Sequence, residues 1–420
     1  MLNKLYCIVV ICCLNLMAKA QSATAYRDDL KNLYAIIQKL PSYKSQIKGE
    51  QEISFTKLYN HLLTEKPAND FDHYYKLAQL MIPIKDNHLF FSQVPPVKLE
   101  NKQFADSAFV QQYRESVAFK SFPKVKVNLT MLEKKLAKKP KDGVEGIYFY
   151  NGDAMKMGLY RTARKDSLVG VVLSTKFSNW QTGQIAMVLK EFEPNRFRAH
   201  FASIDQKTFG LLRNEKFMHG MLTETRWKKD PKAIDHVNIA GNMLTFQFKT
   251  IDKDTRYMRL GSFSSTEANL PISQKFFDSI KDSLTAKNLL IDLRNNGGGG
   301  YKSSDKFMKL LRQFSADGSH IFVLMNNRTM SNAEQFAVRI RKSDNVMMLG
   351  ETTNGTLAYG NNEGTVETLP GSRFSLYITD MPDSGRYLQF EDVGVLPDVK
   401  LDPDKDWISQ AVKVIKGKEQ

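Results

Sequence analysis

Cysteine is almost absent from this chain of 420 residues, and its three cysteines all lie within the first 13 positions. If that N-terminal stretch is removed, the remaining chain can form no disulfide, no thiolate zinc site and no cysteine nucleophile. Its stability must then come from an ordinary hydrophobic core. Long apolar runs are also absent, apart from one at the N-terminus, and this excludes a multi-span membrane protein.

The N-terminal run is typical of a secretory signal peptide over residues 1–20. Lys4 supplies the positive charge, residues 5–17 form the apolar run, and residues 18–20 (Ala-Lys-Ala) are a small-residue cleavage site. We therefore expect an exported protein, periplasmic or secreted, with no stable membrane insertion after cleavage. The alternative interpretation of this run is an N-terminal anchor helix.

Acidic residues are outnumbered by basic ones, which gives a formal net charge of +15. Such a charge could suit nucleic acid or an anionic surface. The densest basic run, residues 134–141, has no interleaved aromatic residues, and the other basic residues are scattered. We therefore interpret this run as a solvated linker and expect no nucleic-acid partner.

The sequence after residue 20 divides into three regions. Residues 21–95 carry apolar positions at helical spacing and predict an N-terminal helical domain. Residues 96–245 predict a β-rich insert, because short alternating runs separated by turn signals fill most of this stretch. Residues 246–420 alternate strands with helices of ten or more residues, which indicates an α/β core with a wound sheet.

Two loops of the α/β core carry residues suited to chemistry. The first, residues 292–300 (DLRNNGGGG), follows a buried strand, and its glycines would let backbone N–H groups face an oxyanion or a phosphate. No Gly-Lys-Ser/Thr follows, so it is not a Walker loop. The alternative is a plain glycine-rich turn.

The second loop, residues 329–334 (TMSNAE), places Ser331 between a strand and a helix. A serine there projects its hydroxyl from the edge of the sheet where α/β sites lie, and the N–H of Asn332 would face the same point. The alternative is a capping box, in which Ser331 caps the helix together with Glu334. The chain contains no G-x-S-x-G, which disfavours an ordinary α/β-hydrolase.

Four segments in order, DLRNNGGGG, TMSNAEQFA, GETTNG and FEDVGVLPDV, resemble the C-terminal processing (tail-specific) serine peptidase family. That family includes the tricorn core protease and interphotoreceptor retinoid-binding protein. The resemblance implies a crotonase-type core in which Ser331 is the nucleophile. It also places the oxyanion hole at Asn332 and at Gly297 or Gly298, and it implies no metal and no cofactor.

The same resemblance bears on the general base. One branch of the family uses a lysine in a T-x-G-K element, but the corresponding position here is Thr356. The tricorn-like branch instead takes a histidine from the N-terminal helical part, and His88 matches it. The resemblance then implies that Glu391 and Asn87 support His88, although that branch has a serine where Asn87 stands.

These observations predict an exported serine peptidase that acts on peptides or unfolded proteins through an acyl-enzyme. No PDZ-like pattern is present, so recognition of C-terminal tails is not implied. One alternative is a non-catalytic protein that binds ligands or peptides on the same fold. Another is an acyl-CoA enzyme of the crotonase type, which export disfavours.

Overall fold

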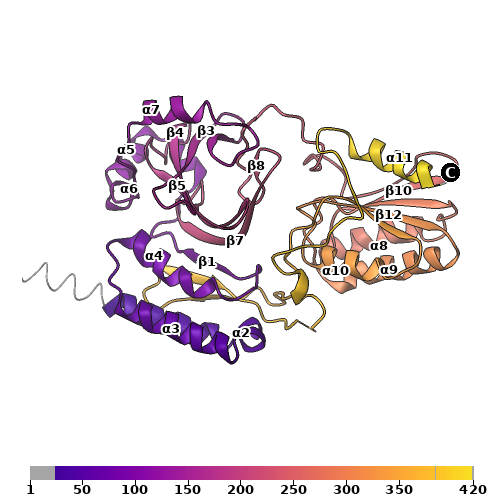
Figure 1. Cartoon of the computed structure of the whole chain (residues 1–420), viewed down its shortest axis with the longest axis horizontal. Helices are drawn as coiled ribbons and strands as arrows, with labels where there is room; N and C mark the ends of the chain where they lie inside the picture. The colour runs from indigo at the N-terminus through magenta and orange to yellow at the C-terminus, as the bar shows by residue number, and fades with distance from the viewer. Residues whose placement is uncertain (1–23, 384, 419–420) are drawn as a thin grey trace, which may run out of the picture. The chain divides into compact units, whose positions relative to one another are not determined.

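The computed structural model of the chain describes residues 24–383 and 385–418, so the predicted signal peptide lies outside the described residues. The chain forms two compact units (Figure 1). The first comprises the described residues up to Lys232 together with Asn361–Met381, and the second comprises Ala233–Gly360 and the described residues from Pro382 onward. No helix among the described residues is both long and apolar enough to cross a bilayer.

This division differs from the predicted domain boundaries. The helical region and the β-rich region, expected as separate domains, belong to one unit, and the chain leaves that unit at Lys232 rather than near residue 245. Asn361–Met381, expected within the α/β core, belongs to the first unit because β15 (Phe374–Tyr377) pairs antiparallel with β1 (Phe90–Gln93).

Helices form where the apolar spacing of residues 21–95 predicts them, and further helices lie within residues 96–136, where a β-rich insert was expected. Residues 24–37 are helical and bury Leu30, Leu33 and Ile37 completely on one face. The side chain of Asn69 accepts a hydrogen bond from the N–H of Asp72 and so caps the helix that begins at Asp70. The remaining helices of this unit are α2 (Pro41–Gln46), α3 (Glu50–Thr64), α4 (Asp70–Ala78), η1 (Gln79–Met81), η2 (Asn101–Ala105), α5 (Ser107–Glu115), α6 (Val117–Lys120) and α7 (Leu129–Leu136).

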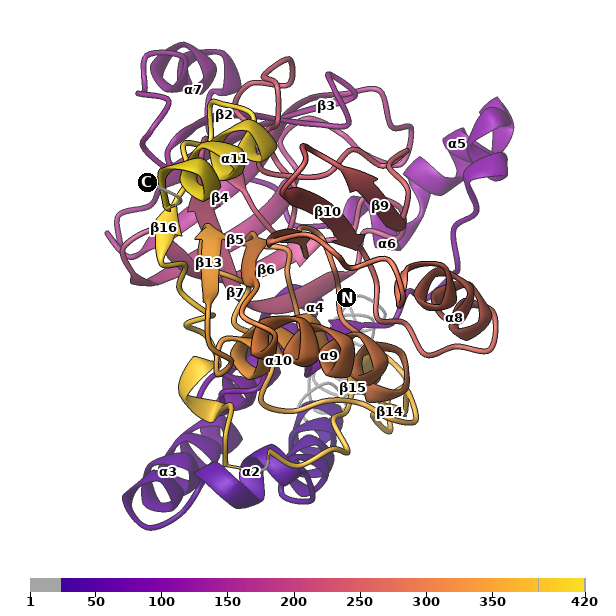
Figure 2. The same ribbon diagram turned by 90° about the vertical axis from the view of Figure 1, so that its right-hand side faces the viewer.

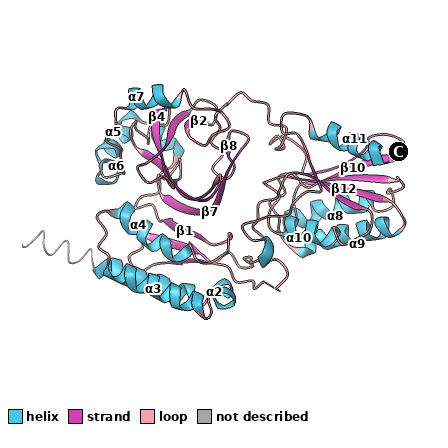
Figure 3. Ribbon diagram, in the orientation of Figure 1, coloured by secondary structure: helices cyan, strands magenta, loops and turns pink. Residues whose placement is uncertain are grey.

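The first unit contains a ten-stranded antiparallel sheet in the order β14-β15-β1-β7-β6-β5-β4-β3-β2, with β8 paired to β7 (Figure 3). Strands β2 to β7 form a meander in which each strand pairs with the next, as the alternating runs predict. The strands not yet given are β2 (Gly146–Tyr150), β3 (Met155–Arg161), β4 (Ser167–Thr175), β5 (Ile185–Glu193), β6 (Arg196–Ala202), β7 (Phe209–Met218), β8 (Met221–Leu222) and β14 (Val366–Thr368).

Lys228 connects the two ends of this meander. Its backbone bridges Phe149 of β2 and Met221 of β8, and β8 pairs with β7, so the strands form a closed ring of hydrogen-bonded neighbours. Closure removes the exposed edge of β2. The unit's core includes Tyr148, Leu189 and other side chains that are fully buried.

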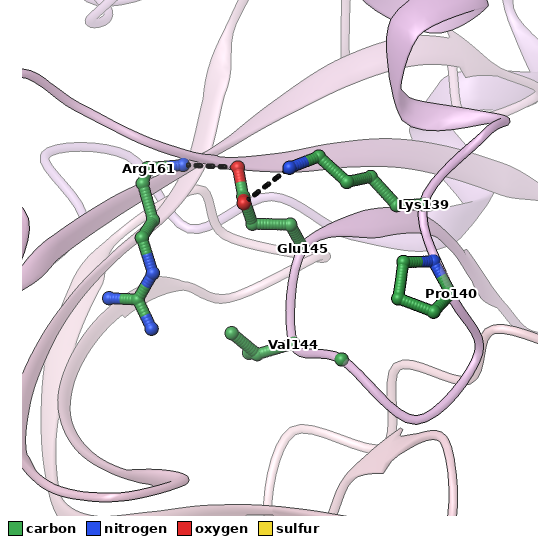
Figure 4. Close-up of a pocket in the computed structure, with 6 residues that line it drawn as sticks. Lys139, Pro140, Val144, Glu145 and Arg161 are labelled. Atoms are coloured by element: carbon green, nitrogen blue, oxygen red, sulfur yellow. Dashed lines mark hydrogen bonds and ion pairs between the residues drawn. The ribbon is translucent and has the colours of Figure 1, made fainter.

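A pocket of about 240 Å³ lies beside β2 and β3 (Figure 4). The Glu145 carboxylate accepts hydrogen bonds from Lys139 Nζ at 2.7 Å and from the Arg161 backbone N–H at 3.1 Å, while the Arg161 guanidinium pairs with Glu191. Both cations of the pocket are therefore compensated. The lining residues are Lys139, Pro140, Gly143, Val144, Glu145 and Arg161.

The second unit is the predicted α/β layer structure. Its six-stranded sheet has the order β16-β13-β12-β11-β10-β9, with all neighbours parallel except β9, which is antiparallel at one edge. The bounds are β9 (Phe246–Thr250), β10 (Thr255–Leu260), α8 (Asn269–Ile280), β11 (Asn288–Asp292), α9 (Tyr301–Ala316), β12 (His320–Met325), α10 (Asn332–Ile340), β13 (Val346–Gly350), η3 (Leu388–Phe390), β16 (Val399–Lys400) and α11 (Trp407–Lys418).

Helices cover both faces of this sheet. Alternate residues of β11 pack on opposite sides: Ile291 lies in one core with α8, α9 and α10, and Leu290 lies in the other with Trp407 of α11. Figures 1 and 2 show α9 and α10 side by side. The unit is thus mixed α/β, and its crotonase-type classification stays a prediction.

Candidate active site

Three loops meet at one edge of the second unit's sheet. They follow β11, β12 and β13, which are parallel, so their C-terminal ends share that edge. Of the seven predicted site residues, this unit holds Gly297, Gly298, Ser331, Asn332 and Glu391, whereas Asn87 and His88 lie in the first unit.

The end of β11 is fixed by a buried ion pair. Arg294 donates to both oxygens of Asp292, with Nη2 to Oδ2 at 2.7 Å and Nε to Oδ1 at 3.0 Å. The hydroxyl of Tyr257 donates to Asp292 Oδ2 at 3.0 Å, and Asp292 is fully buried. These contacts give the Asp-Leu-Arg motif a structural role, which is to set where the glycine loop begins.

Asparagine side chains then tie the loops together. The N–H of Asn295 donates to Asn326 Oδ1 at 3.0 Å, and Asn326 Nδ2 donates to Asn295 Oδ1 at 2.7 Å. Asn296 Nδ2 donates to the carbonyl of Leu260 at 2.8 Å. The glycine loop is therefore held against the loop after β12 and against the end of β10.

Gly298 is the point where the glycine loop touches the serine loop. Its φ is +90°, and a Cβ there would lie 2.7 Å from Ser331 Cβ and 2.9 Å from the Asn332 nitrogen. Only glycine fits this approach. The N–H of Gly298 donates to Asn296 Oδ1 at 2.9 Å, so an oxyanion would have to compete with that amide oxygen. A Cβ at Gly297 would meet no atom within 4 Å.

The backbone of Ser331 adopts φ 54° and ψ −126°, a conformation that residues other than glycine rarely adopt. Elsewhere in the chain, the residue before α3 has nearly the same conformation, φ 57° and ψ −123°, and there it is Gly49. Ser331 and Glu334 do form the predicted capping box. An ordinary capping residue is extended, however, as Asn69 is at φ −163° and ψ 178°. The strained strand-to-helix turn is typical of a nucleophile elbow.

Glu334 holds this turn against the loop after β13. Its carboxylate is fully buried and accepts four hydrogen bonds. Oε1 takes the Thr353 hydroxyl at 2.5 Å and the Gly355 N–H at 2.7 Å, and Oε2 takes the N–H groups of Thr356 at 2.9 Å and Ser331 at 3.1 Å. A buried carboxylate is stable only when its oxygens are satisfied in this way.

Thr356, the position of the lysine in the other branch of the family, adjoins Ser331. Its carbonyl accepts the Ser331 N–H at 2.8 Å, and its side chain is buried and donates to Asn354. The residue next to Ser331 is therefore a threonine, where the other branch of the family has its lysine.

Glu391 supports the same loop. Its Oε2 accepts the N–H groups of Leu357 at 2.9 Å and Ala358 at 2.8 Å, and the side chain is 1% exposed. The following residue, Asp392, donates its N–H to the carbonyl of Gly355 at 2.9 Å. Its predicted action on His88 stays a prediction.

In the first unit, Asn87 and His88 lie in the turn that leads into β1. Asp86 is fully buried and organises this turn: its Oδ1 accepts the His88 N–H at 3.2 Å, and its Oδ2 accepts the Thr379 hydroxyl at 2.7 Å. Burial lowers the pKa of His88 below the ordinary 6.5, and the Asp86 carboxylate opposes that shift in part.

The sequence analysis assigns Glu334 only a helix-capping role, and it assigns Asp86 no role. The spacing of Glu334 from Ser331 was visible, but its bonds to residues 353–356 depend on how β13 lies beside β12. No set of three His, Cys, Asp or Glu side chains within residues 24–383 and 385–418 is placed to hold a metal ion.

No family model matches the chain. Its sequence is 27% identical over 170 residues to the chloroplastic C-terminal processing peptidase of Tetradesmus obliquus, a match that covers 35% of each protein. The match thus spans about a third of that peptidase's length. It confirms the resemblance to C-terminal processing peptidases that the four motifs predict.

Two solved structures show weaker likeness. The photosystem II D1 C-terminal processing protease is 15% identical, with a TM-score of 0.39 and coverage of 93% of this chain and 97% of that one. Mature CPAF complexed with lactacystin is 11% identical, with a TM-score of 0.41 and coverage of 95% and 99%. At these values the two likenesses carry no argument about this chain's activity.

The strain at Ser331 predicts a difference between two variants. Ser331→Gly should be more stable than Ser331→Ala by roughly 1 kcal/mol, because glycine adopts this positive φ at little cost whereas alanine does not. Urea unfolding followed by circular dichroism measures the difference. Equal stability of the two variants would contradict a strained backbone at this position.

Proposed function

We propose that the chain is an exported serine peptidase with Ser331 as its nucleophile and His88 as its general base. The observation that carries the proposal is the strained turn of Ser331, pressed against Gly298 and followed by the first N–H of α10. The sequence similarity of this chain to a C-terminal processing peptidase supports the same proposal. The substrates are peptides or unfolded proteins, and the reaction needs no cofactor.

Peptide hydrolysis would proceed in two steps. Ser331 Oγ attacks the scissile carbonyl carbon while its proton passes to His88, and His88 then gives that proton to the leaving amine, which leaves an ester on Ser331. Water attacks this ester with its proton again passing to His88, and His88 returns that proton to Ser331 Oγ as the ester bond breaks and the carboxylic acid product leaves.

The oxyanion of each tetrahedral intermediate would be held by backbone donors. The N–H of Asn332 is at the first position of α10, where it has no intrahelical acceptor. The second donor in this proposal is Gly298, whose N–H would exchange Asn296 Oδ1 for the stronger oxyanion acceptor. One such donor is worth about 3 kcal/mol.

His88 is preferred as base because the alternative base is missing beside Ser331. Thr356 occupies the lysine position, and its hydroxyl cannot act as a base near neutral pH. The lowered pKa of His88 keeps its ring neutral at pH 6.5 and above, which is the form that accepts a proton. In this proposal Glu391 and Asn87 support the ring.

A non-catalytic binding protein is the second candidate. It is favoured by Asn87, which stands where the tricorn-like branch has a serine, and the same crotonase-type fold would serve either function. A chemical probe of Ser331 separates the two candidates.

Ser331 should react with a serine-directed fluorophosphonate, and Ser331→Ala should not. The substitution should also lower peptide hydrolysis by about 10³-fold or more, because no other group replaces the nucleophile. Mass spectrometry of the labelled chain identifies the modified residue. Ser303, a fully buried serine of α9, provides the control: Ser303→Ala should still be labelled. Label that persists in Ser331→Ala would remove Ser331 from the mechanism.

The glycine loop allows a matched pair of variants. Gly298→Ala should reduce hydrolysis by about 10²-fold, because the new Cβ would collide with Ser331 and Asn332 at the oxyanion site. Gly297→Ala should have little effect, since its Cβ meets no atom within 4 Å. Rates are compared after circular dichroism confirms that both variants fold. Equal activity of the pair would mean that the glycine run is only a turn.

The pH profile tests the base. If His88 accepts the proton, kcat/KM should fall in acid with a midpoint below 6.5, because burial lowers the pKa of this histidine. His88→Ala should remove most turnover. His61→Ala is the control, since that side chain is 67% exposed on α3. An unchanged rate and profile in His88→Ala would exclude it as base.

A further inference from the structure

Asp86 is a buried carboxylate two residues before the proposed base, and the proposed mechanism does not use it. Its side chain is fully buried, and its two oxygens have different partners. Oδ1 accepts the backbone N–H of His88 at 3.2 Å, and Oδ2 accepts the Thr379 hydroxyl at 2.7 Å. The first bond closes a tight turn, so it fixes the backbone from which the imidazole extends.

Several elements of the first unit meet at this carboxylate. Thr379 follows β15, Ser42 lies in α2, and Arg213, which is also buried, lies in β7. Burial raises the pKa of the carboxyl group above its ordinary value. Four neighbours lower that pKa and so favour the ionised form: the hydroxyls of Thr379 and Ser42 and the charges of His88 and Arg213.

The charge of Asp86 acts on the imidazole of His88. Burial lowers the pKa of this ring, and the Asp86 carboxylate is the group that opposes the shift. Each charge therefore favours the other, because the protonated ring in turn favours ionised Asp86. The histidine base of a serine peptidase needs such a partner, since it carries a positive charge whenever it holds the transferred proton.

We propose that Asp86 is the positioning residue of the base, holding the His88 backbone through one oxygen and stabilising the imidazolium with its charge. The inference rests on the proposed function, because it takes His88 to be the base. The neighbouring Asn87 cannot supply this charge, since its amide is neutral. Asp86 thus adds a negative charge from the first unit to the support that the family resemblance assigns to Glu391.

Asp86→Asn removes the charge and keeps the shape of the side chain. Its amide oxygen can still accept the His88 N–H, and its NH₂ group can donate to the Thr379 oxygen. Asp29→Asn is the matched control, because Asp29 is 1% exposed in the same unit and faces another histidine, His73, at 3.3 Å.

NMR of the histidine rings in the isotope-labelled chain measures the pH midpoint at which each ring takes up a proton, and the His88 signal is the one that is missing in His88→Ala. In Asp86→Asn the His88 midpoint should fall by about 1 pH unit, the smaller end of what a neighbouring opposite charge does to a pKa. The acid limb of kcat/KM should move down with it. On the plateau above that limb, kcat/KM should fall about tenfold, since the imidazolium loses its counter-charge. Asp29→Asn should leave the His88 midpoint and the pH profile at their wild-type positions.

Two results would overturn the inference: an unchanged His88 midpoint in folded Asp86→Asn, and a shift of the same size in Asp29→Asn. If Asp86→Asn does not fold, Thr379→Val takes its place. That variant removes a donor that favours ionised Asp86, so the His88 midpoint should fall by a smaller amount, and no fall would reject the inference.

The midpoint is measured without turnover, whereas fluorophosphonate labelling reports on Ser331. Labelled wild-type protein with an unshifted His88 midpoint in Asp86→Asn therefore rejects this inference alone. A wild-type chain that takes no label rejects the proposed function, and the inference with it.

Discussion

The loops around Ser331 depend on the buried carboxylate of Glu334. Four donors from two loops converge on its two oxygens, and three of them are backbone N–H groups. Removing the carboxylate would take an acceptor from each of these donors, and a buried donor left unsatisfied costs about 1–3 kcal/mol. The Ser331 N–H alone would keep a second acceptor, the Thr356 carbonyl. The carboxylate equally needs all of them, because an ionised group is stable in the interior only when it is fully hydrogen-bonded. The serine turn and the loop after β13 therefore form a single structural element.

That element fixes the conformation of Ser331 from both sides. The Ser331 N–H is bonded to the Thr356 carbonyl and to Glu334, so the backbone cannot relax from its positive φ without breaking two hydrogen bonds. Gly298 closes the other side, since its missing Cβ is the space in which Ser331 Cβ and the Asn332 nitrogen lie. Strain of this kind persists only where several independent contacts hold the backbone in the strained conformation.

Local patterns in the sequence predicted much of this architecture, and pairings between distant segments account for what they missed. The strand that ends at Asp292 and the helix that begins at Asn332 were evident from periodicity and from the glycine and serine turns. The pairing of β1 with β15 joins segments nearly 300 residues apart, and no local pattern encodes such a partner. The same reason applies to Glu334, whose short-range role as a capping residue was visible and whose bonds to residues 353–356 were not.

Two of the energetic costs in this unit fall on consecutive residues. Ser331 has a strained backbone, and Asn332 buries an amide oxygen that no described residue satisfies. The compensating contacts lie immediately around them, in the Glu334 carboxylate, the Asn295–Asn326 amide pair and the Asp292–Arg294 ion pair. A turn that only capped a helix would need neither cost, because an extended serine caps equally well. This contrast supports the proposal that the turn is a reaction site, whichever residue supplies the base.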